Sequence, residues 1–232
     1  MDAGTPQNTV VKSVKYRYAD HVRSDILRAV PDDGKVIGSI GCGTGGTEGV
    51  LVKQGRQVHG VDISAEAINV ARTRLSSARV VDSYELRPFE PETLDGLIVA
   101  DVLEHMPLAK ERLREFVHAV KPGGWVIISV PNMRYIDALW AFVVRGDWPE
   151  VTAGIFDDTH VQVMTHKRLE RWCHEAGLSI MRWYGRANAR GWRRDLWRRW
   201  FDRLTLGLFH HLFQYQIQVL CRRERDPDGD SD

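Results

Sequence analysis

The sequence has few cysteines and almost no net charge. Its three cysteines, at positions 42, 173 and 221, are widely spaced, so they predict neither a disulfide framework nor a zinc site and favour reduced thiols in the cytoplasm. The 32 Lys and Arg residues nearly balance the 31 Asp and Glu residues, which gives a formal net charge of +1 at pH 7. The overall charge therefore gives no argument for a nucleic-acid or acidic partner.

Long apolar runs are also missing. No stretch reaches the length of about 18 apolar residues that a membrane-spanning helix needs. Residues 1–8 are polar and lack the apolar region of a signal peptide, so we expect a cytoplasmic protein. Hydrophobic residues still make up 43% of the chain, enough to form the core of a domain. We expect flexible tails at 1–10 and 224–232 on either side of a single domain at 11–223.

Between the tails, short apolar runs alternate with helical patterns. A Pro- and Gly-rich turn at 121–124 is expected to stop the helix before it. The alternation predicts an α/β fold: a Rossmann-like, doubly wound sheet of seven mostly parallel strands with helices on both faces. The expected strands are 35–40, 57–61, 78–81, 96–100, 125–130, 178–184 and 214–221, and the expected helices are 47–54, 64–77, 107–120 and 165–176.

Two segments interrupt the alternation: 132–160 after the fifth strand and 185–213 after the sixth. Residues 134–144 are apolar on most sides, as in an inserted helix. Insertions after strand ends lie at the rim where sheets of this kind bind ligands. We therefore expect both segments to act as lids and to determine specificity.

A glycine-rich turn, Gly41-Cys42-Gly43-Thr44-Gly45, follows the first strand directly. Glycines let the chain turn tightly and approach a ligand closely, and the next helix presents its N–H groups there. Asp62, 21 positions after Gly41, is placed to accept hydrogen bonds from ribose hydroxyls. Because Gly46 completes a G-x-G-x-x-G pattern, a dinucleotide remains an alternative ligand. A tight turn without any ligand is the third interpretation.

Four segments in order distinguish these alternatives: Ile40–Gly45, 58–64, 101–106 and 120–125, the last followed by Pro131-Asn132. Together they resemble the class I S-adenosylmethionine-dependent methyltransferases, of the small-molecule or polysaccharide-cluster type. The resemblance implies that S-adenosylmethionine is the cofactor and S-adenosylhomocysteine the product.

The resemblance also implies which residues contact the cofactor. Asp62 has an alternative role as a helix N-cap, and Asp82 as an ordinary turn residue. The implied contacts are the backbone of Gly41, Cys42, Gly43, Thr44 and Gly45 with the amino-acid part, Asp62 with the ribose, Ile63 with the adenine, Asp82 and Ser83 with the adenine amino group, and Asp101 and Val102 with the methionine part.

Other candidates lie around this set. Glu104 and His105 either touch cofactor or substrate or simply open the next helix. Tyr16 and Tyr18 either cap the cofactor or belong to a helix that packs on the sheet.

His160 is the candidate general base. The Asp-x-Thr-His pattern at 157–160 resembles a subset of these methyltransferases in which this loop closes over the active site. Histidine titrates near neutrality, as a base for an alcohol should. The alternative is that His160 only orders its loop. Trp140 and Phe156 either cover the substrate or pack within the insertion. No compact His, Asp or Glu cluster is visible in the sequence, so no metal is expected.

A basic aromatic stretch lies in the second insertion. Eight arginines against two acids occur from Arg182 to Arg203. Three interpretations stay open: an amphipathic helix on the sheet, a grip on an anionic acceptor, or peripheral membrane contact through 191–204 with a lipid-linked acceptor. Nucleic acid is least favoured, because no recognised binding module accompanies the charge.

The sequence therefore predicts methyl transfer to a hydroxyl of a small molecule, such as a sugar, a glycoconjugate or a natural-product precursor. The alternatives are an N-methyltransferase, an NAD-dependent oxidoreductase that uses the same glycine turn, and a non-catalytic cofactor-binding subunit. The oligomeric state is not indicated.

Overall fold

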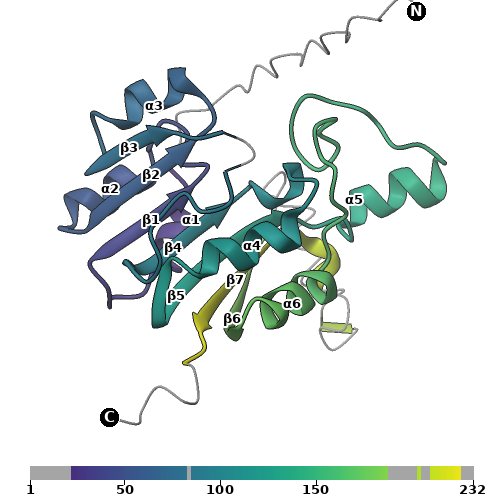
Figure 1. Ribbon diagram of the computed structural model, residues 1–232. Coiled ribbons are helices and arrows are strands. Elements are labelled where there is room, and N and C mark those ends of the chain that lie inside the picture. Colours follow the sequence, from purple (N-terminus) through teal and green to yellow (C-terminus); the bar gives the residue numbers. More distant parts are fainter. Residues whose placement is uncertain (1–21, 83–84, 188–202, 205–209, 226–232) are drawn as a thin grey trace, which may run out of the picture.

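The computed structural model describes residues 22–82, 85–187, 203–204 and 210–225 (Figure 1). The expected N-terminal tail at 1–10, together with Tyr16, Tyr18 and Ser83, lies outside this part of the chain, as do residues 226–232 of the expected C-terminal tail. The same holds for most of the basic aromatic stretch.

A seven-stranded sheet runs through the described residues in the order β3-β2-β1-β4-β5-β7-β6. Neighbours among the first five strands are parallel, whereas β7 is antiparallel to both β5 and β6. The predicted α/β fold with a mostly parallel sheet is confirmed. The strands are β1 (Val36–Ile40), β2 (Gln57–Asp62), β3 (Ser77–Val80), β4 (Leu94–Ala100), β5 (Val120–Pro131), β6 (Leu178–Ala187) and β7 (Gln214–Arg223).

Successive residues of the central strands point to opposite faces of the sheet, as the pleat requires. Val99 of β4 belongs to a core with Leu113 and Leu169, whereas its neighbour Ile98 belongs to a second core with Leu51. Both faces are therefore covered by helices, as Figure 1 shows. The helices are α1 (Ser24–Leu27), α2 (Glu48–Lys53), α3 (Ala65–Ala71), α4 (Ala109–Val117), α5 (Ile136–Leu139) and α6 (His166–Glu175), with 3₁₀ turns η1 (Leu103–His105) and η3 (His210–Phe213) and a π-helical turn η2 (Trp140–Val144).

Side-chain caps start two of these helices where the sequence predicted. The hydroxyl of Ser64 accepts from the N–H of Ala67 at the start of α3, and Thr165 accepts from Arg168 at the start of α6. Such caps satisfy N–H groups that have no partner within the helix.

Two local predictions were wrong. The helix expected at 64–77 ends at Ala71, because Ser77 already pairs with His59 of β2 and must be extended. The turn expected at 121–124 lies within β5, which continues through a register shift against β4. Gly123 absorbs this irregularity with a φ of +78°.

The first insertion projects from the body of the domain, and α5 is its visible helix (Figure 1). The helix expected at 134–144 forms as α5 and η2 together. A small core that includes Tyr135, Ala138 and Ile155 anchors it, but the side chains of Trp140 and Phe142 are about 60% exposed, at 59% and 64%. None of the helices in the described residues combines the length and apolar character needed to cross a membrane.

Candidate active site

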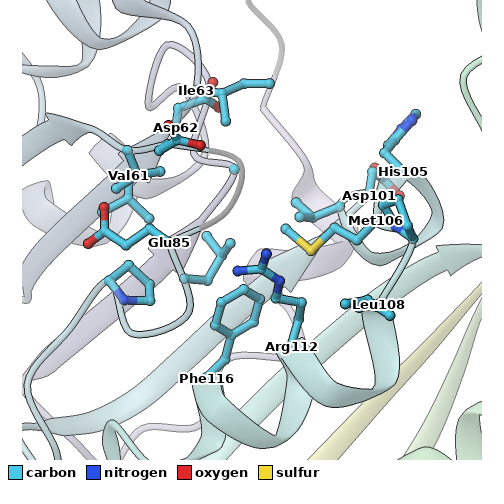
Figure 2. Close-up of a pocket in the computed structure, with 17 residues that line it drawn as sticks. Val61, Asp62, Ile63, Glu85, Asp101, His105, Met106, Leu108, Arg112 and Phe116 are labelled. Atoms are coloured by element: carbon cyan, nitrogen blue, oxygen red, sulfur yellow. The ribbon is translucent and has the colours of Figure 1, made fainter.

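The loops after β1, β2, β3 and β4 meet at the carboxyl edge of the sheet and enclose a cavity of about 400 Å³. This edge, where the strand order reverses between β1 and β4, is where α/β sheets bind ligands. Figure 2 shows Asp62 and Ile63 on one side, His105 and Met106 across from them, and Phe116 on α4 between. The cavity is lined by Ile40, Gly41, Val61, Asp62, Ile63, Val81, Asp82, Glu85, Pro88, Asp101, Val102, His105, Met106, Pro107, Leu108, Arg112 and Phe116.

The glycine turn borders this cavity through Gly41. Gly41, Gly43 and Gly45 all have positive φ angles, of +69°, +53° and +71°, which only glycine adopts without strain. The N–H groups of Gly41 and Cys42 donate to the carbonyl of Val61 at 2.8 and 3.1 Å, which ties the turn to the end of β2. A Cβ atom on Gly41 would lie 2.3 Å from Cγ2 of Val102. The turn is therefore shaped for close packing under the loop after β4.

Within the turn, only Gly41 lines the cavity. Cys42 is buried against Ile68 and Leu75 beneath it, and burial raises the pKa of its thiol well above the ordinary value. The backbone carbonyl of Thr44 accepts from Arg74 at 3.3 Å. These contacts place the side chains of Cys42 and Thr44 in the packing that supports the turn.

Asp62 connects the turn to α3. Its Oδ2 atom accepts from the N–H of Gly43 at 2.8 Å and its Oδ1 atom from the N–H of Ser64 at 2.9 Å, and its side chain is only 3% exposed. The N-cap alternative is excluded for Asp62, since Ser64 caps α3. Ile63 and Asp82 stand beside Asp62 in the cavity wall, as a nucleoside-type ligand would require.

Asp101 follows β4 directly and has a left-handed conformation, with a φ of +57°. Its carboxylate pairs with the guanidinium of Arg23 and accepts from Gln216 at 2.7 Å and from the Ser129 hydroxyl at 3.4 Å. A strained backbone held by several partners is typical of a functional position. The sequence analysis missed Arg23 and Gln216, because nothing in the local pattern marks residues that meet Asp101 only in the folded chain.

The acids around this network have opposite pKa shifts. Burial raises the pKa of Asp25, but its hydrogen bonds and ion pair with Arg23 outweigh burial, and the pKa falls to about 2. Glu48 is buried beside the Ser39 hydroxyl, and burial raises its pKa. Asp25 is therefore ionised, because its ion pair and hydrogen bonds with Arg23 outweigh the effect of burial.

Arg112 lines the cavity together with several apolar side chains. Met106, Leu108, Pro88 and Phe116 line it, and none was singled out in the sequence. The α4 residues Arg112 and Phe116 are four positions apart, so they lie on one face of the helix. This helical spacing is the one sequence signal that could have marked them.

Two histidines lie together where the first insertion meets η1. The ring centroids of His105 and His160 are 4.8 Å apart. Nδ1 of His105 lies 2.9 Å from Oγ1 of Thr159, and that hydroxyl lies 2.5 Å from Oδ1 of Asp157. Nδ1 of His160 faces the carbonyl of Ile155 at 3.2 Å. His105 lines the cavity, whereas His160 is not among the residues that line it.

Glu104 anchors the insertion to η1. Its carbonyl accepts from the N–H groups of Val161 and Gln162 at 2.9 and 3.1 Å. Its carboxyl group is fully buried, with no hydrogen-bond partner for Oε2 among the described residues, and burial followed by the nearby Asp101 raises its pKa well above the ordinary value.

Glu104, His105 and His160 bring their ligand-type atoms within 4.8 Å of one another. This cluster is not visible in the sequence, because His160 meets Glu104 and His105 only in the folded chain. The span is wider than two bonds of about 2.1 Å to one zinc ion, so side chains would have to rotate before all three could bind a single ion.

The remaining candidates lie apart from the cavity. Trp140 is exposed on η2, and Phe156 packs edge-on against Trp148 at 4.9 Å. Both belong to the projecting insertion, so any contact with a bound acceptor is made at the rim.

Comparisons with known proteins agree with this geometry. A family model described as a methyltransferase domain matches residues 14–182. Among curated proteins, the chain is 28% identical over 156 residues to the ubiquinone biosynthesis O-methyltransferase of Azoarcus sp. (strain BH72), covering 64% of this chain and 66% of that one. The protein of the same name from Burkholderia ambifaria (strain MC40-6) is 34% identical over 116 residues, covering 47% and 50%. The chain thus spans between half and two thirds of the length of these relatives.

Solved structures share the fold. A SAM-dependent methyltransferase from Archaeoglobus fulgidus superimposes with a TM-score of 0.64 at 18% identity, covering 86% of this chain and 91% of that one. An S-adenosylmethionine-dependent methyltransferase from Mesorhizobium loti gives a TM-score of 0.63 at 19% identity, with coverages of 86% and 96%.

Proposed function

The chain belongs to the class I S-adenosylmethionine-dependent methyltransferases, and from this premise we propose that it methylates a hydroxyl group of a small molecule. The observation that carries the proposal is one continuous cavity, which runs from Gly41 and Asp62 to His105. The end with Gly41 and Asp62 has groups that suit a nucleoside, and the other end has His105, a side chain able to take a proton. The oxidoreductase alternative is set aside, because the family match is to methyltransferases.

The cavity fits the cofactor in chemistry and in shape. The absence of a side chain at Gly41 lets Val102 pack directly against the turn in the cavity wall, and the buried Asp62 is suited to accept from the ribose hydroxyls. Ile63 and Asp82 would contact the adenine, and Asp101 and the neighbouring Val102 the methionine part. When bound, S-adenosylmethionine supplies a methyl group already activated on a sulfonium.

An alcohol must lose its proton to become a good nucleophile, and a positioned base is worth about 10²–10⁴-fold in rate. Histidine is suited to this task near neutral pH. The sequence pattern indicates His160 as a candidate base, and in the structure His105 lies beside it. The presence of this pair favours a hydroxyl acceptor over an amine, which needs a dedicated base less.

The acceptor is proposed to enter beside the first insertion. Trp140 and Phe142 present exposed apolar surface there, which suits an acceptor with an apolar part. The relatives' names point to an intermediate of ubiquinone biosynthesis, and the sequence pattern to a sugar or glycoconjugate, including anionic or lipid-linked forms. For a lipid-linked acceptor, we propose in addition that residues 191–204 contact the membrane surface.

An acceptor screen tests the proposed function. The full chain would be incubated with S-adenosylmethionine and with sugars, nucleotide sugars or phenolic quinone precursors, and S-adenosylhomocysteine release would be measured. We expect release with one acceptor class and a methyl ether as the second product. Calorimetry with S-adenosylhomocysteine and with NAD runs in parallel. Tight NAD binding without S-adenosylhomocysteine binding would contradict the proposal, and cofactor binding without turnover on any acceptor would favour a non-catalytic subunit.

A further inference from the structure

The hydroxyl of Thr159 lies between a carboxylate and a histidine. Oδ1 of Asp157 accepts both the backbone N–H of Thr159, at 2.9 Å, and its hydroxyl, at 2.5 Å. On its other side, the same hydroxyl oxygen is 2.9 Å from Nδ1 of His105. Asp157 and Thr159 come from the first insertion and His105 from η1, so the contact joins segments 54 positions apart.

Counting protons assigns the direction of each hydrogen bond. An ionised carboxylate only accepts, so the single hydroxyl proton of Thr159 is donated to Asp157. The hydroxyl oxygen can then only accept from His105, so Nδ1 of His105 carries the hydrogen. In the neutral ring the basic lone pair is therefore on Nε2. The tautomer follows from the hydrogen-bond partners, as is usual for histidine.

Asp157 is suited to hold this arrangement. Burial raises its pKa, but the two hydrogen bonds from Thr159 and the neighbouring histidines outweigh burial and leave the pKa below its ordinary value. Asp157 is therefore ionised at neutral pH, as the proton count requires.

We infer that His105 is the general base of the proposed methyl transfer, and that Asp157 and Thr159 are positioning residues that fix its tautomer with Nε2 as the basic nitrogen. The inference rests on the proposed function. The acceptor oxygen gives its proton to Nε2 and uses that electron pair to bond the methyl carbon, while the sulfur keeps the pair of the broken carbon–sulfur bond. The proton on His105 then passes to solvent, which restores the neutral ring.

The surroundings of His105 keep its ring neutral and able to accept. Burial, and then the facing His160, lower the pKa of His105, whereas Asp157, a hydrogen bond to the backbone of Thr159, and Asp101 act in the opposite direction but do not cancel the effect. Burial raises the pKa of the preceding residue, Glu104, well above its ordinary value, which favours its uncharged form. A base with a lowered pKa is in its active form at neutral pH.

His160 is less well placed for this role. It is not among the residues that line the cavity, whereas His105 is. Its Nδ1 faces the carbonyl of Ile155, a contact that orders the insertion. His160 therefore acts on His105 through their 4.8 Å ring contact, as a further positioning residue.

A matched pair of variants at Thr159 tests the tautomer directly. Thr159→Ser keeps the hydroxyl, and Thr159→Val keeps the shape without it. Nitrogen-15 NMR of the full chain, with and without S-adenosylhomocysteine, would report which ring nitrogen of His105 is protonated, and His105→Asn would identify its signals. We expect an Nδ1–H signal in the wild type and Thr159→Ser, and a mixture of tautomers in Thr159→Val. An Nε2–H signal in the wild type, or no change in Thr159→Val, would overturn the inference.

Turnover gives the second readout, once an acceptor is known. His105→Asn should lower kcat by about 10²-fold or more, and Thr159→Val by about tenfold, with Thr159→Ser recovering most of the loss. His160→Asn should lower kcat less than His105→Asn and raise the pH at which kcat reaches half its maximum. A loss in His160→Asn as large as that in His105→Asn would overturn the inference, as would a divalent-cation requirement that the His105 variant abolishes. Lack of turnover with every acceptor contradicts the proposed function and, with it, the role of His105 as a base, whereas the NMR result decides the tautomer assignment independently.

Discussion

Gly41 lies directly against Val102, so that a Cβ atom on residue 41 would fall 2.3 Å from Cγ2 of Val102. The contact joins the loop after β1 to the loop after β4, the two strands between which the strand order reverses. Two requirements therefore meet at one glycine: a backbone with φ of +69°, and no side chain. Gly55 meets only the first requirement, which makes a controlled test available.

Gly41→Ala should weaken S-adenosylhomocysteine binding by about tenfold or more, because Val102 must move into the cavity wall. Gly55→Ala is the matched control, since Gly55 has a φ of +88° but nothing beyond its chain neighbours within 4 Å of the position that a Cβ would take. Both variants should lose about 1–2 kcal/mol of unfolding free energy from backbone strain, and Gly41→Ala more. Calorimetry and urea unfolding measure the two effects; equal affinities for the two variants would show that the Gly41–Val102 contact does not shape the cofactor site.

Asp62→Asn should weaken S-adenosylhomocysteine binding by about 10- to 100-fold, the effect of losing a charged acceptor for ligand hydroxyls. Asp33→Asn is the control, because Asp33 pairs with Arg222 away from the cavity. The thermal midpoint should be measured as well, since Asp62 also accepts from Gly43 and Ser64. Unchanged affinity in Asp62→Asn would contradict the proposal that Asp62 binds the ribose hydroxyls.

Local patterns carried most of the fold prediction. The strand–turn–helix at Gly41, the cap at Ser64 and the alternation of apolar runs each depend on residues close in sequence, so a single sequence reveals them. The register of β5 with β4 was not predictable in this way. Trp125 packs over Gly96, where a Cβ would lie 2.1 Å from its ring, and the strand extends through 121–124 because of that pairing.

The residues of the site likewise fall into those that the local sequence predicts and those that only the fold brings together. Asp62 is the last residue of a strand and was predictable, whereas Arg23 meets Asp101 across 78 positions and has no motif. The pattern at 157–160 was visible, but it drew attention to His160. The hydroxyl of Thr159 contacts His105 instead, and only the fold brings those two residues together.

Asp25→Asn should reduce stability at neutral pH and have little effect in acid. The pKa of Asp25 is lowered to about 2 in the folded protein from an ordinary value of 3.8, so its contribution to stability is present above pH 4 and is lost as the pH falls toward 2. The contribution is about 2 kcal/mol at neutral pH. Urea unfolding of both proteins from pH 7 to pH 2 measures it. A difference between the proteins that stays constant over this range would contradict the ion pair with Arg23.

Glu104→Gln should show the opposite pH dependence. The pKa of Glu104 is raised by burial, so the folded protein favours the protonated carboxyl group, and that preference stabilises the fold fully only below the ordinary pKa of 4.5. As the pH rises through the folded pKa, the wild type must either bury a charge or hold a proton that the unfolded chain has released. The glutamine side chain carries no charge at any pH, and it has nearly the same shape as a protonated glutamate. The variant should therefore match the wild type near pH 4 and become the more stable protein as the pH rises to 8, as measured by urea midpoints.

Glu85→Gln is a suitable control, because Glu85 pairs with Arg79 at the surface and the loss of this pair should give no such rise in stability. If Glu104→Gln instead loses stability as the pH rises, the buried carboxylate must gain a cationic partner in solution, and a divalent cation held with His105 and His160 would be the first to test by repeating the series with a chelator.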